Sequence, residues 1–528
     1  MGETVVGEKG MVVAPHRAAA EAGAEILREG GNAVEAMIAA AATIAVVYPH
    51  MNSIGGDGFW LIAEPGRPPR AIDACGAAGA FATRERYEAK GYDRIPARGP
   101  DAALTVAGTV SGWTLALEAA ASLGGRMPRG DLIADAIRRA REGSPVSRSE
   151  ASALRDNLAE FSAFRPFAAQ FLPGGKVPEV GANRTQPKLA ATLEQLAHAG
   201  FDDFYRGDVA AEIAADLEEA GTPVTRADLE KHEARLVVPL SLALPGVDLF
   251  NTPPPTQGLA SLIILGLFER LKVARGESFE HLHGLIESAK RAYRVRDRHV
   301  TDPAFGGGVR QFLEAAWLDA EADAIDRQYA ATASAGGEGD TVWLGAIDRK
   351  GVAVSFIQSI YWEFGSGIFL PRTGILWQNR GTAFSLDPAA VNPLSPGRKP
   401  FHTLNPPLAR FRDGRTIAYG SMGGDGQPQF QAAIFTRHAA FGMEPGDAID
   451  APRWRFGRTW GADSGELPME EGFDPDLVRA LERAGHPVRI LPERYSEGMG
   501  HAGMIVRRAD GRMLGSSDPR CDGAAVAA

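Results

Sequence analysis

A short run of small residues divides the 528-residue chain into two parts of different character. Residues 331–340 read Ala-Thr-Ala-Ser-Ala-Gly-Gly-Glu-Gly-Asp and offer no side chain that builds a core, which is typical of a surface loop. Amphipathic helical patterns dominate before this run, and runs typical of strands dominate after it. We therefore expect an α+β fold in which the two parts share sheets, because each sheet edge needs a partner.

The helical spacing of apolar residues recurs in the first part of the chain. The predicted helices are residues 17–28, 34–47, 132–142, 187–199, 209–220, 259–271 and 279–293. The predicted strands are residues 59–62 and 236–244 in the first part, and 342–347, 352–360, 375–377 and 416–419 in the second.

Composition excludes several classes of function. The formal net charge is -10 without a basic run, which gives no electrostatic footprint for nucleic acid and favours a small-molecule substrate. The only two cysteines, Cys75 and Cys521, cannot build a disulfide framework or a cysteine-rich zinc site. Histidines such as His402 and His501 lack ligand spacing, so no metal or other cofactor is expected.

Targeting and membrane segments are not expected either. Residues 1–10 lack an apolar signal core, and the apolar run 36–47 is too short to span a bilayer. These features predict a soluble, cytoplasmic protein without a membrane partner.

Thr341 stands where the small-residue run meets the first strand of the second part. Alone, a threonine at the start of a strand is most often structural. Cleavage of the bond between Asp340 and Thr341 would place a hydroxyl and a free α-amino group on one residue, and an amine that titrates near ~8 can activate that hydroxyl. Downstream, Gly423 and Gly424 follow a predicted strand and can turn their N–H groups toward an oxyanion, although a plain glycine turn is the alternative.

Several ordered segments, from about His16 to Gly523, carry a family resemblance. They are residues 30–33 (Gly-Gly-Asn-Ala), 54–58 (Ile-Gly-Gly-Asp-Gly), 253–255 (Pro-Pro-Pro), 341 with 348–351 (Asp-Arg-Lys-Gly), 364–367 (Phe-Gly-Ser-Gly), 423–424 (Gly-Gly) and 517–520 (Ser-Asp-Pro-Arg). As an ordered set, they resemble the γ-glutamyltranspeptidase superfamily.

The resemblance implies an αββα sandwich of the N-terminal nucleophile hydrolase type, made as one precursor that cuts itself between Asp340 and Thr341. Residues 1–340 would form a large subunit and 341–528 a small one, together one interwoven domain. Thr341 would be the nucleophile, and Gly423 and Gly424 would supply the oxyanion hole. A higher homo-oligomer stays open.

The sequence departs from the family where glutamate is recognised. The family's arginine in the large subunit is replaced by Cys75. Its glutamine and aspartate in the small subunit are replaced by Arg380 and Ala383, and its serine pair by His402 and Thr403. The fixed charges that hold a glutamyl group are thus lost at their usual positions.

Arg380 is instead expected to bind a carboxylate close to the scissile amide, although a surface or sheet-edge arginine is the structural alternative. Ser359, His402 and Thr403 are expected to complete the substrate-binding residues.

The runs at 341–345, 355–361, 377–381 and 423–429 are similar to the branch of the superfamily that releases ammonia and oxalate from oxamate in purine and allantoin breakdown. The expected substrate is therefore a small anionic amide such as oxamate. One alternative is a γ-glutamyltransferase or glutathione hydrolase with a rebuilt recognition site. Another is an unprocessed, non-catalytic homologue that acts as a binding or structural protein.

Overall fold

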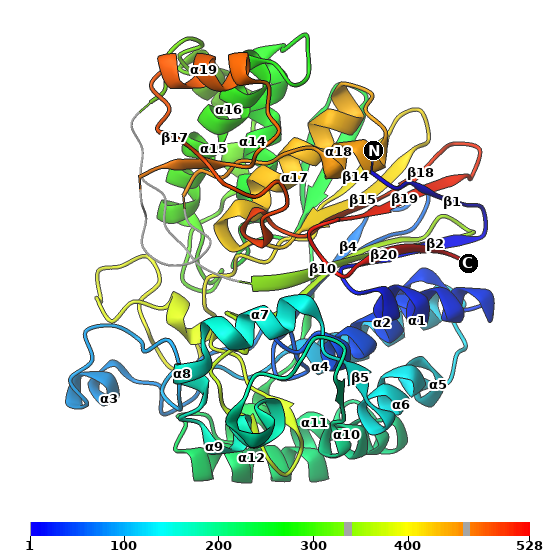
Figure 1. Cartoon of the computed structure of the whole chain (residues 1–528), viewed down its shortest axis with the longest axis vertical. Coiled ribbons are helices and arrows are strands. Elements are labelled where there is room, and N and C mark those ends of the chain that lie inside the picture. Colours follow the sequence, from blue (N-terminus) through cyan, green and yellow to red (C-terminus); the bar gives the residue numbers. More distant parts are fainter. Residues whose placement is uncertain (1, 332–339, 458–464) are drawn as a thin grey trace.

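Two antiparallel sheets lie face to face at the centre of the fold, with helices on both outer faces (Figure 1). The structure is a computed structural model that describes residues 2–331, 340–457 and 465–528. The predicted αββα sandwich is confirmed. The loop predicted at 331–340 falls almost entirely on residues 332–339, outside the described residues.

Each sheet combines strands from both sides of Thr341. The first sheet has the spatial order β1 (Val5–Gly7), β19 (Met513–Ser517), β18 (Ala502–Arg507), β15 (Thr416–Ser421), β14 (Leu408–Phe411), β9 (Val247–Asn251) and β8 (Leu240–Leu244). The second has the order β20 (Ala524–Ala527), β2 (Gly10–Ala14), β10 (Asp340–Asp348), β11 (Ala353–Tyr361), β3 (Asp57–Ala63), β4 (Arg70–Ala74) and β7 (Arg235–Val237). Neither part of the chain therefore builds either of these two sheets alone.

Helices of the first part cover the outer face of the second sheet, in the lower half of Figure 1. α1 (Arg17–Arg28), α2 (Ala33–Val47) and α4 (Thr109–Ser122) contact its strands. The capping box of Asn32 and Glu35 starts α2, since each side chain accepts a hydrogen bond from the other residue's backbone N–H. Every residue of α2 is buried, which explains why its sequence is apolar on all faces.

The first sheet is covered by helices from both parts of the chain, in the upper half of Figure 1. α14 (Gly258–Leu271), α17 (Gln427–Phe435) and α18 (Pro445–Asp450) contact its strands, and α15 (Phe279–His299) packs on α14 and α17. No helix among the described residues has both the length and the apolar character needed to cross a membrane.

The remaining elements are short or peripheral. The helices are α3 (Arg84–Ala89), α5 (Arg129–Leu132), α6 (Ala134–Glu142), α7 (Arg148–Asp156), α8 (Leu158–Phe161), α9 (Arg165–Phe171), α10 (Pro187–Ala199), α11 (Asp203–Arg206), α12 (Asp208–Ala220), α13 (Arg226–Lys231), α16 (Ala315–Asp323) and α19 (Pro475–Arg483). The strands are β5 (Ser144–Pro145), β6 (Asn183–Arg184), β12 (Phe369–Leu370), β13 (Ile375–Leu376), β16 (Leu467–Met469) and β17 (Val488–Ile490).

The predicted elements agree with the structure except at a few positions. Residues 17–28 and 187–199 are helices with the predicted bounds. The predicted strand 236–244 is wrong: it is two strands, β7 and β8, in different sheets, because Pro239 lacks the N–H that a continuous ladder needs. The predicted helix 132–142 is interrupted at Ile133, and the helix predicted to end at residue 293 continues to His299.

Trp343 is the largest side chain between the two sheets. It projects from β10, and its indole N–H donates to Ser355 Oγ at 2.9 Å. Gly420 on β15 and Gly503 on β18 lie directly against the ring: a Cβ at these positions would lie 2.2 and 2.4 Å from ring atoms. These glycines let the sheets close over the tryptophan.

Gly420→Ala is therefore expected to lower the free energy of unfolding by about 1–3 kcal/mol or more, because the added methyl overpacks the intersheet core. Gly130→Ala is the matched control, since a Cβ at Gly130 meets nothing within 4 Å. Thermal melting of the two variants beside the parent measures the difference. Equal melting temperatures for all three proteins would contradict the prediction.

Candidate active site

Thr341 is the second residue of β10, a central strand of the second sheet. Its side chain is fully buried. The pairing register with β11 shifts between Asp340 and Val342. Such β-bulges re-aim side chains and are common next to active sites. The expected cleavage site thus coincides with an irregularity in an otherwise regular strand.

Gln427, the first residue of α17, contacts the Thr341 hydroxyl. Its Nε2 donates to Thr341 Oγ1 at 3.3 Å, and its Oε1 accepts from Asn405 Nδ2 at 3.0 Å. Asn405 is itself held, because its Nδ2 also donates to Thr403 O at 3.1 Å and its Oδ1 accepts from Ser261 Oγ at 2.7 Å. This chain of amides makes Gln427 present its nitrogen to the threonine. Sequence reasoning did not assign Gln427 to the site.

Gly423 and Gly424 form the turn between β15 and α17. Both have left-handed backbone conformations, with φ of 118° and 52°. A Cβ at Gly423 would lie 2.7 Å from the Phe430 ring, so a side chain is excluded by space as well as by conformation. Among the described residues, no hydrogen bond uses the N–H of either glycine. Two backbone donors are thus available beside the start of α17.

The buried ion pair of Arg296 and Asp425 stabilises the turn of Gly423 and Gly424. Arg296 Nη1 donates to Asp425 Oδ1 at 2.9 Å and to Gln257 Oε1 at 3.0 Å. Gln257 Nε2 then donates to Gly424 O at 2.9 Å and to Thr403 O at 2.6 Å. The pair holds the glycine turn and the segment of Thr403 in a fixed relation, because each polar group in the chain has its partner.

Arg380 is a buried cation with an open edge. Only 1% of the side chain is exposed, and its guanidinium carbon lies 3.7 Å from the centre of the Tyr361 ring. Nη1 is 3.4 Å from Thr403 Oγ1, whereas Nε and Nη2 have no hydrogen-bond partner in the described part of the chain. Burial lowers the pKa of Arg380 to about 10, so it remains charged at neutral pH. Arg380 is therefore not a surface arginine.

Asp57 and His402 lie in the same buried region. Asp57 Oδ1 accepts the backbone N–H groups of Gly76 and Gly108, both at 3.0 Å. Its Oδ2 is 3.3 Å from His402 Nε2, but the angles do not make a hydrogen bond, and neither imidazole nitrogen has a partner within the described residues. Burial raises the pKa of Asp57 to about 6 and holds the pKa of His402 well below its usual value.

The triple-proline segment holds His402 in place. The backbone of His402 donates to Pro255 O and accepts from Gln257 N, both at 2.9 Å. The Phe59 ring packs edge-on against the imidazole, with 4.9 Å between the ring centres. Residues 253–255, to which the sequence alone gave no role, thus help to position the His402 side chain.

The other predicted or replaced positions surround this group. Ser359 Oγ accepts the Tyr361 N–H at 2.7 Å, and Ser359 pairs with Asp57 across β11 and β3. Cys75 is fully buried and its thiol pKa is raised by burial. Ala383 ends the short helical turn that begins at Arg380. The structure thus brings Arg380, Thr403 and His402 together. It also adds Asp57, a carboxylate within residues 54–58 to which the sequence analysis gave no role.

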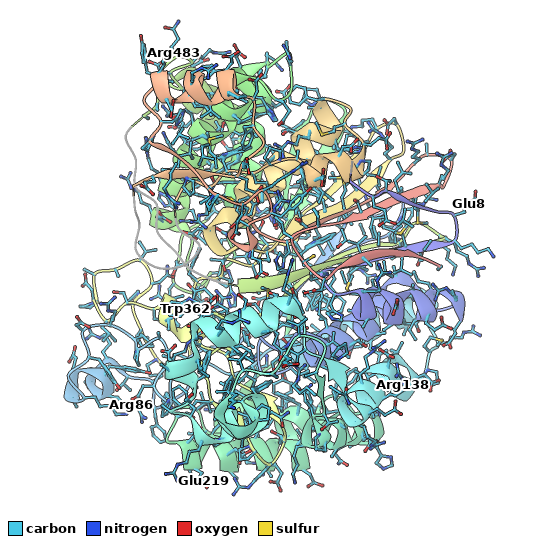
Figure 2. All side chains as sticks on the ribbon, viewed as in Figure 1. Glu8, Arg86, Arg138, Glu219, Trp362 and Arg483 are labelled. Carbon is cyan, nitrogen blue, oxygen red and sulfur yellow. The ribbon has the colours of Figure 1, made fainter. Side chains whose placement is uncertain are left out.

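An open cavity of about 890 Å³ adjoins the segment after β11. Its lining includes Trp362, which lies near α7 and α8 in Figure 2, and residues of both helices. The backbone N–H of Trp362 donates to Asn379 Oδ1 at 3.1 Å. This hydrogen bond connects the wall of the cavity to the residue that precedes Arg380.

One group of candidate metal ligands occurs among the described residues: His283, Glu287 and His486. The two histidines are hydrogen-bonded to each other at 2.9 Å, and Glu287 accepts from Lys290 Nζ at 2.6 Å. His283 Nε2 also lies 2.8 Å from Asp326 O. The group includes none of the residues around Thr341, and the expectation that catalysis needs no metal stays a prediction.

A buried threonine at the start of a central strand, in two stacked sheets between helical layers, defines an amide hydrolase of the N-terminal nucleophile class, made as one precursor. The chain belongs to the γ-glutamyltranspeptidase family, since that family's sequence model, described as Gamma-glutamyltranspeptidase, matches residues 19–528.

Three relatives are similar over the whole chain. The oxamate amidohydrolase proenzyme of Klebsiella pneumoniae is 51% identical, with 100% of both chains covered. The glutathione hydrolase-like YwrD proenzyme of Bacillus subtilis is 39% identical, again with 100% of both chains covered. The crystal structure of cephalosporin acylase from Bacillus halodurans superposes with a TM-score of 0.92 at 33% identity, covering 100% of this chain and 97% of that one.

Gln427→Met is expected to slow conversion of the precursor by up to about tenfold, because it removes a hydrogen bond to the Thr341 hydroxyl worth on the order of 1 kcal/mol. Gln186→Met is the control, since Gln186 is equally buried but donates to Val46 O. The fraction of cut chain over time, followed on denaturing gels, gives the rates. Equal rates for the two variants would show that the Gln427 contact is irrelevant to cleavage.

Proposed function

We propose that the precursor is cut between Asp340 and Thr341, giving subunits of residues 1–340 and 341–528 that form one interwoven domain. The mature enzyme then hydrolyses a short amide that bears a carboxylate, with oxamate as the substrate, which yields oxalate and ammonia. Both subunits contribute strands to both sheets, so they are expected to stay associated after the cut. A cytoplasmic location stays a prediction.

The observation that carries the substrate proposal is the open edge of Arg380. Nε and Nη2 of a guanidinium form the fork that binds both oxygens of a carboxylate. At Arg380 these two nitrogens lack partners among the described residues, although the side chain is buried. A buried, unpaired charge is unfavourable unless a ligand completes it, so the arrangement favours an anionic substrate.

The mechanism uses groups of this chain only. The free α-amino group of Thr341 takes the proton from Oγ1, which attacks the amide carbon. The N–H groups of Gly423 and Gly424 stabilise the oxyanion while Arg380 holds the carboxylate. The protonated amine then gives its proton to the leaving nitrogen, and ammonia departs. Water hydrolyses the resulting ester on Thr341 and releases oxalate.

The similarity to the oxamate amidohydrolase proenzyme supports this substrate, and the loss of family charges at Cys75 and Ala383 argues against a glutamyl substrate. Glutamate would need partners for both its α-carboxylate and its α-amino group, and leaving such charges unpaired costs several kcal/mol.

Maturation is tested by the identity of the new N-terminus. Edman or mass analysis of the purified protein is expected to give Thr341. Thr341→Ala is expected to stay uncut, whereas Thr341→Ser is expected to cut slowly, because serine keeps a hydroxyl and alanine does not. One intact band for the parent protein would favour a non-catalytic homologue, and a different new end would overturn the nucleophile assignment.

The substrate is tested by measuring ammonia release from oxamate beside glutamate release from glutathione, with the mature protein. We expect turnover of oxamate. Turnover of glutathione with none of oxamate would contradict the proposal and favour a γ-glutamyl enzyme.

Arg380→Lys is expected to lower kcat/KM for oxamate by about tenfold or more, because lysine keeps the charge but loses the planar fork. Self-cleavage is expected to survive, because the attack of Thr341 on its own peptide needs the hydroxyl, and lysine keeps the positive charge at this position. The comparison uses oxamate kinetics and gel conversion on the same preparations. Unchanged kinetics would remove Arg380 from the substrate-binding residues.

A further inference from the structure

Asp57 Oδ2 and both nitrogens of His402 are buried polar atoms that the proposed mechanism does not use. Within the described residues, none of the three has a hydrogen-bond partner. Buried polar atoms are nearly always satisfied, so several orphaned ones in the buried region that also contains Arg380 indicate a place built for a ligand. What Asp57 does there follows from the charges around it.

The fixed charges near Arg380 balance almost to zero. Lys399 Nζ donates to Asp73 Oδ2 at 2.6 Å, and these two charges cancel. The remaining ionised groups are Arg380 and Asp57, whose attraction raises the pKa of the arginine and lowers that of the aspartate against the larger, opposite effect of burial. One cation therefore faces one carboxylate.

The other titratable groups that face Asp57 are neutral. Burial lowers the pKa of His232 to about 4 and that of His402 well below its usual value. Burial also raises the pKa of the Cys75 thiol well above its usual range. None of these groups supplies a second positive charge at neutral pH.

We propose that Asp57 links substrate binding to proton uptake: it takes up one proton from solvent when a carboxylate binds Arg380. The inference rests on the proposed function, in which Arg380 holds the carboxylate. With Asp57 ionised, a bound carboxylate would place two anions against one cation. Protonated, Asp57 keeps the balance and offers Oδ2–H as a donor.

The probes are glycolate, a monoanion, and oxalate, a dianion of similar size, titrated into the mature protein by calorimetry. Titrations at pH 7.5 in two buffers with different ionisation enthalpies count the protons taken up. We expect the parent to take up close to one proton more per glycolate than Asp57→Asn. Asparagine does not titrate, its Oδ1 can still accept the Gly76 and Gly108 N–H groups, and any uptake by the Thr341 α-amino group is common to both proteins.

The same titrations compare affinities. For Asp57→Asn, both probes are expected to bind with an affinity on the order of tenfold or more above that of the parent at pH 7.5, because no proton has to be taken up. Asp216→Asn is the matched control, since Asp216 is also buried but pairs with Arg372 on the periphery. It is expected to keep both the proton uptake and the affinities of the parent.

A series with the parent protein needs no variant and covers the case in which Asp57→Asn fails to mature. Because the pKa of Asp57 is raised to about 6, glycolate affinity is expected to be constant below that pH and to fall as the pH rises through it. No proton uptake, a pH-independent affinity, or no binding of glycolate by the parent would each overturn the inference. Ammonia release from oxamate tests the proposed function separately, so failure of one leaves the other standing.

Discussion

The pairing of β10 between β2 and β11 determines where every other part of the site must lie. These hydrogen bonds hold Thr341 at one end of a buried central strand, although the chain is expected to be cut immediately before it. The cut is tolerable because strands from both parts alternate in both sheets, so separating the parts would break ladders and expose the intersheet core. The glycine turn and Gln427 then approach Thr341 from the facing sheet and its helix α17.

The proposed recognition site takes its charges from new sequence positions. Cys75 and Ala383 stand where the family resemblance implies an arginine and an aspartate, yet the structure contains a buried arginine, Arg380, and a buried aspartate, Asp57, beside one another. Their arrangement differs in its consequence, because Asp57 has one oxygen fixed by two backbone donors and the other left open. In the proposals above, Arg380 holds the carboxylate of the substrate and Asp57 becomes protonated when it binds.

Local pattern predicted most of the helices, the family resemblance supplied the candidate site residues, and long-range contacts followed from neither. Periodicity and caps determine α1 and α10, and Arg380 stood out because it replaces a glutamine that the resemblance implies. Asp57 and Gln427 were inside quoted motifs but unassigned, because their partners, His402 and Thr341, are distant in sequence. Pro239 was the one available signal that residues 236–244 are two strands.

The proposed cleavage site and the proposed carboxylate-binding arginine are both next to Tyr361, at one end of β10 and β11. In the uncut chain, β10 begins at Asp340, which pairs with Tyr361, and the ring of Tyr361 carries the Arg380 guanidinium. Thr341 and Arg380 are both buried in this state. Cleavage after Asp340 would free its backbone from this pair and shorten β10 to begin at the nucleophile. The event that creates the α-amino base would then also clear the strand position next to Arg380, so that the precursor would lack both the base and this cleared position.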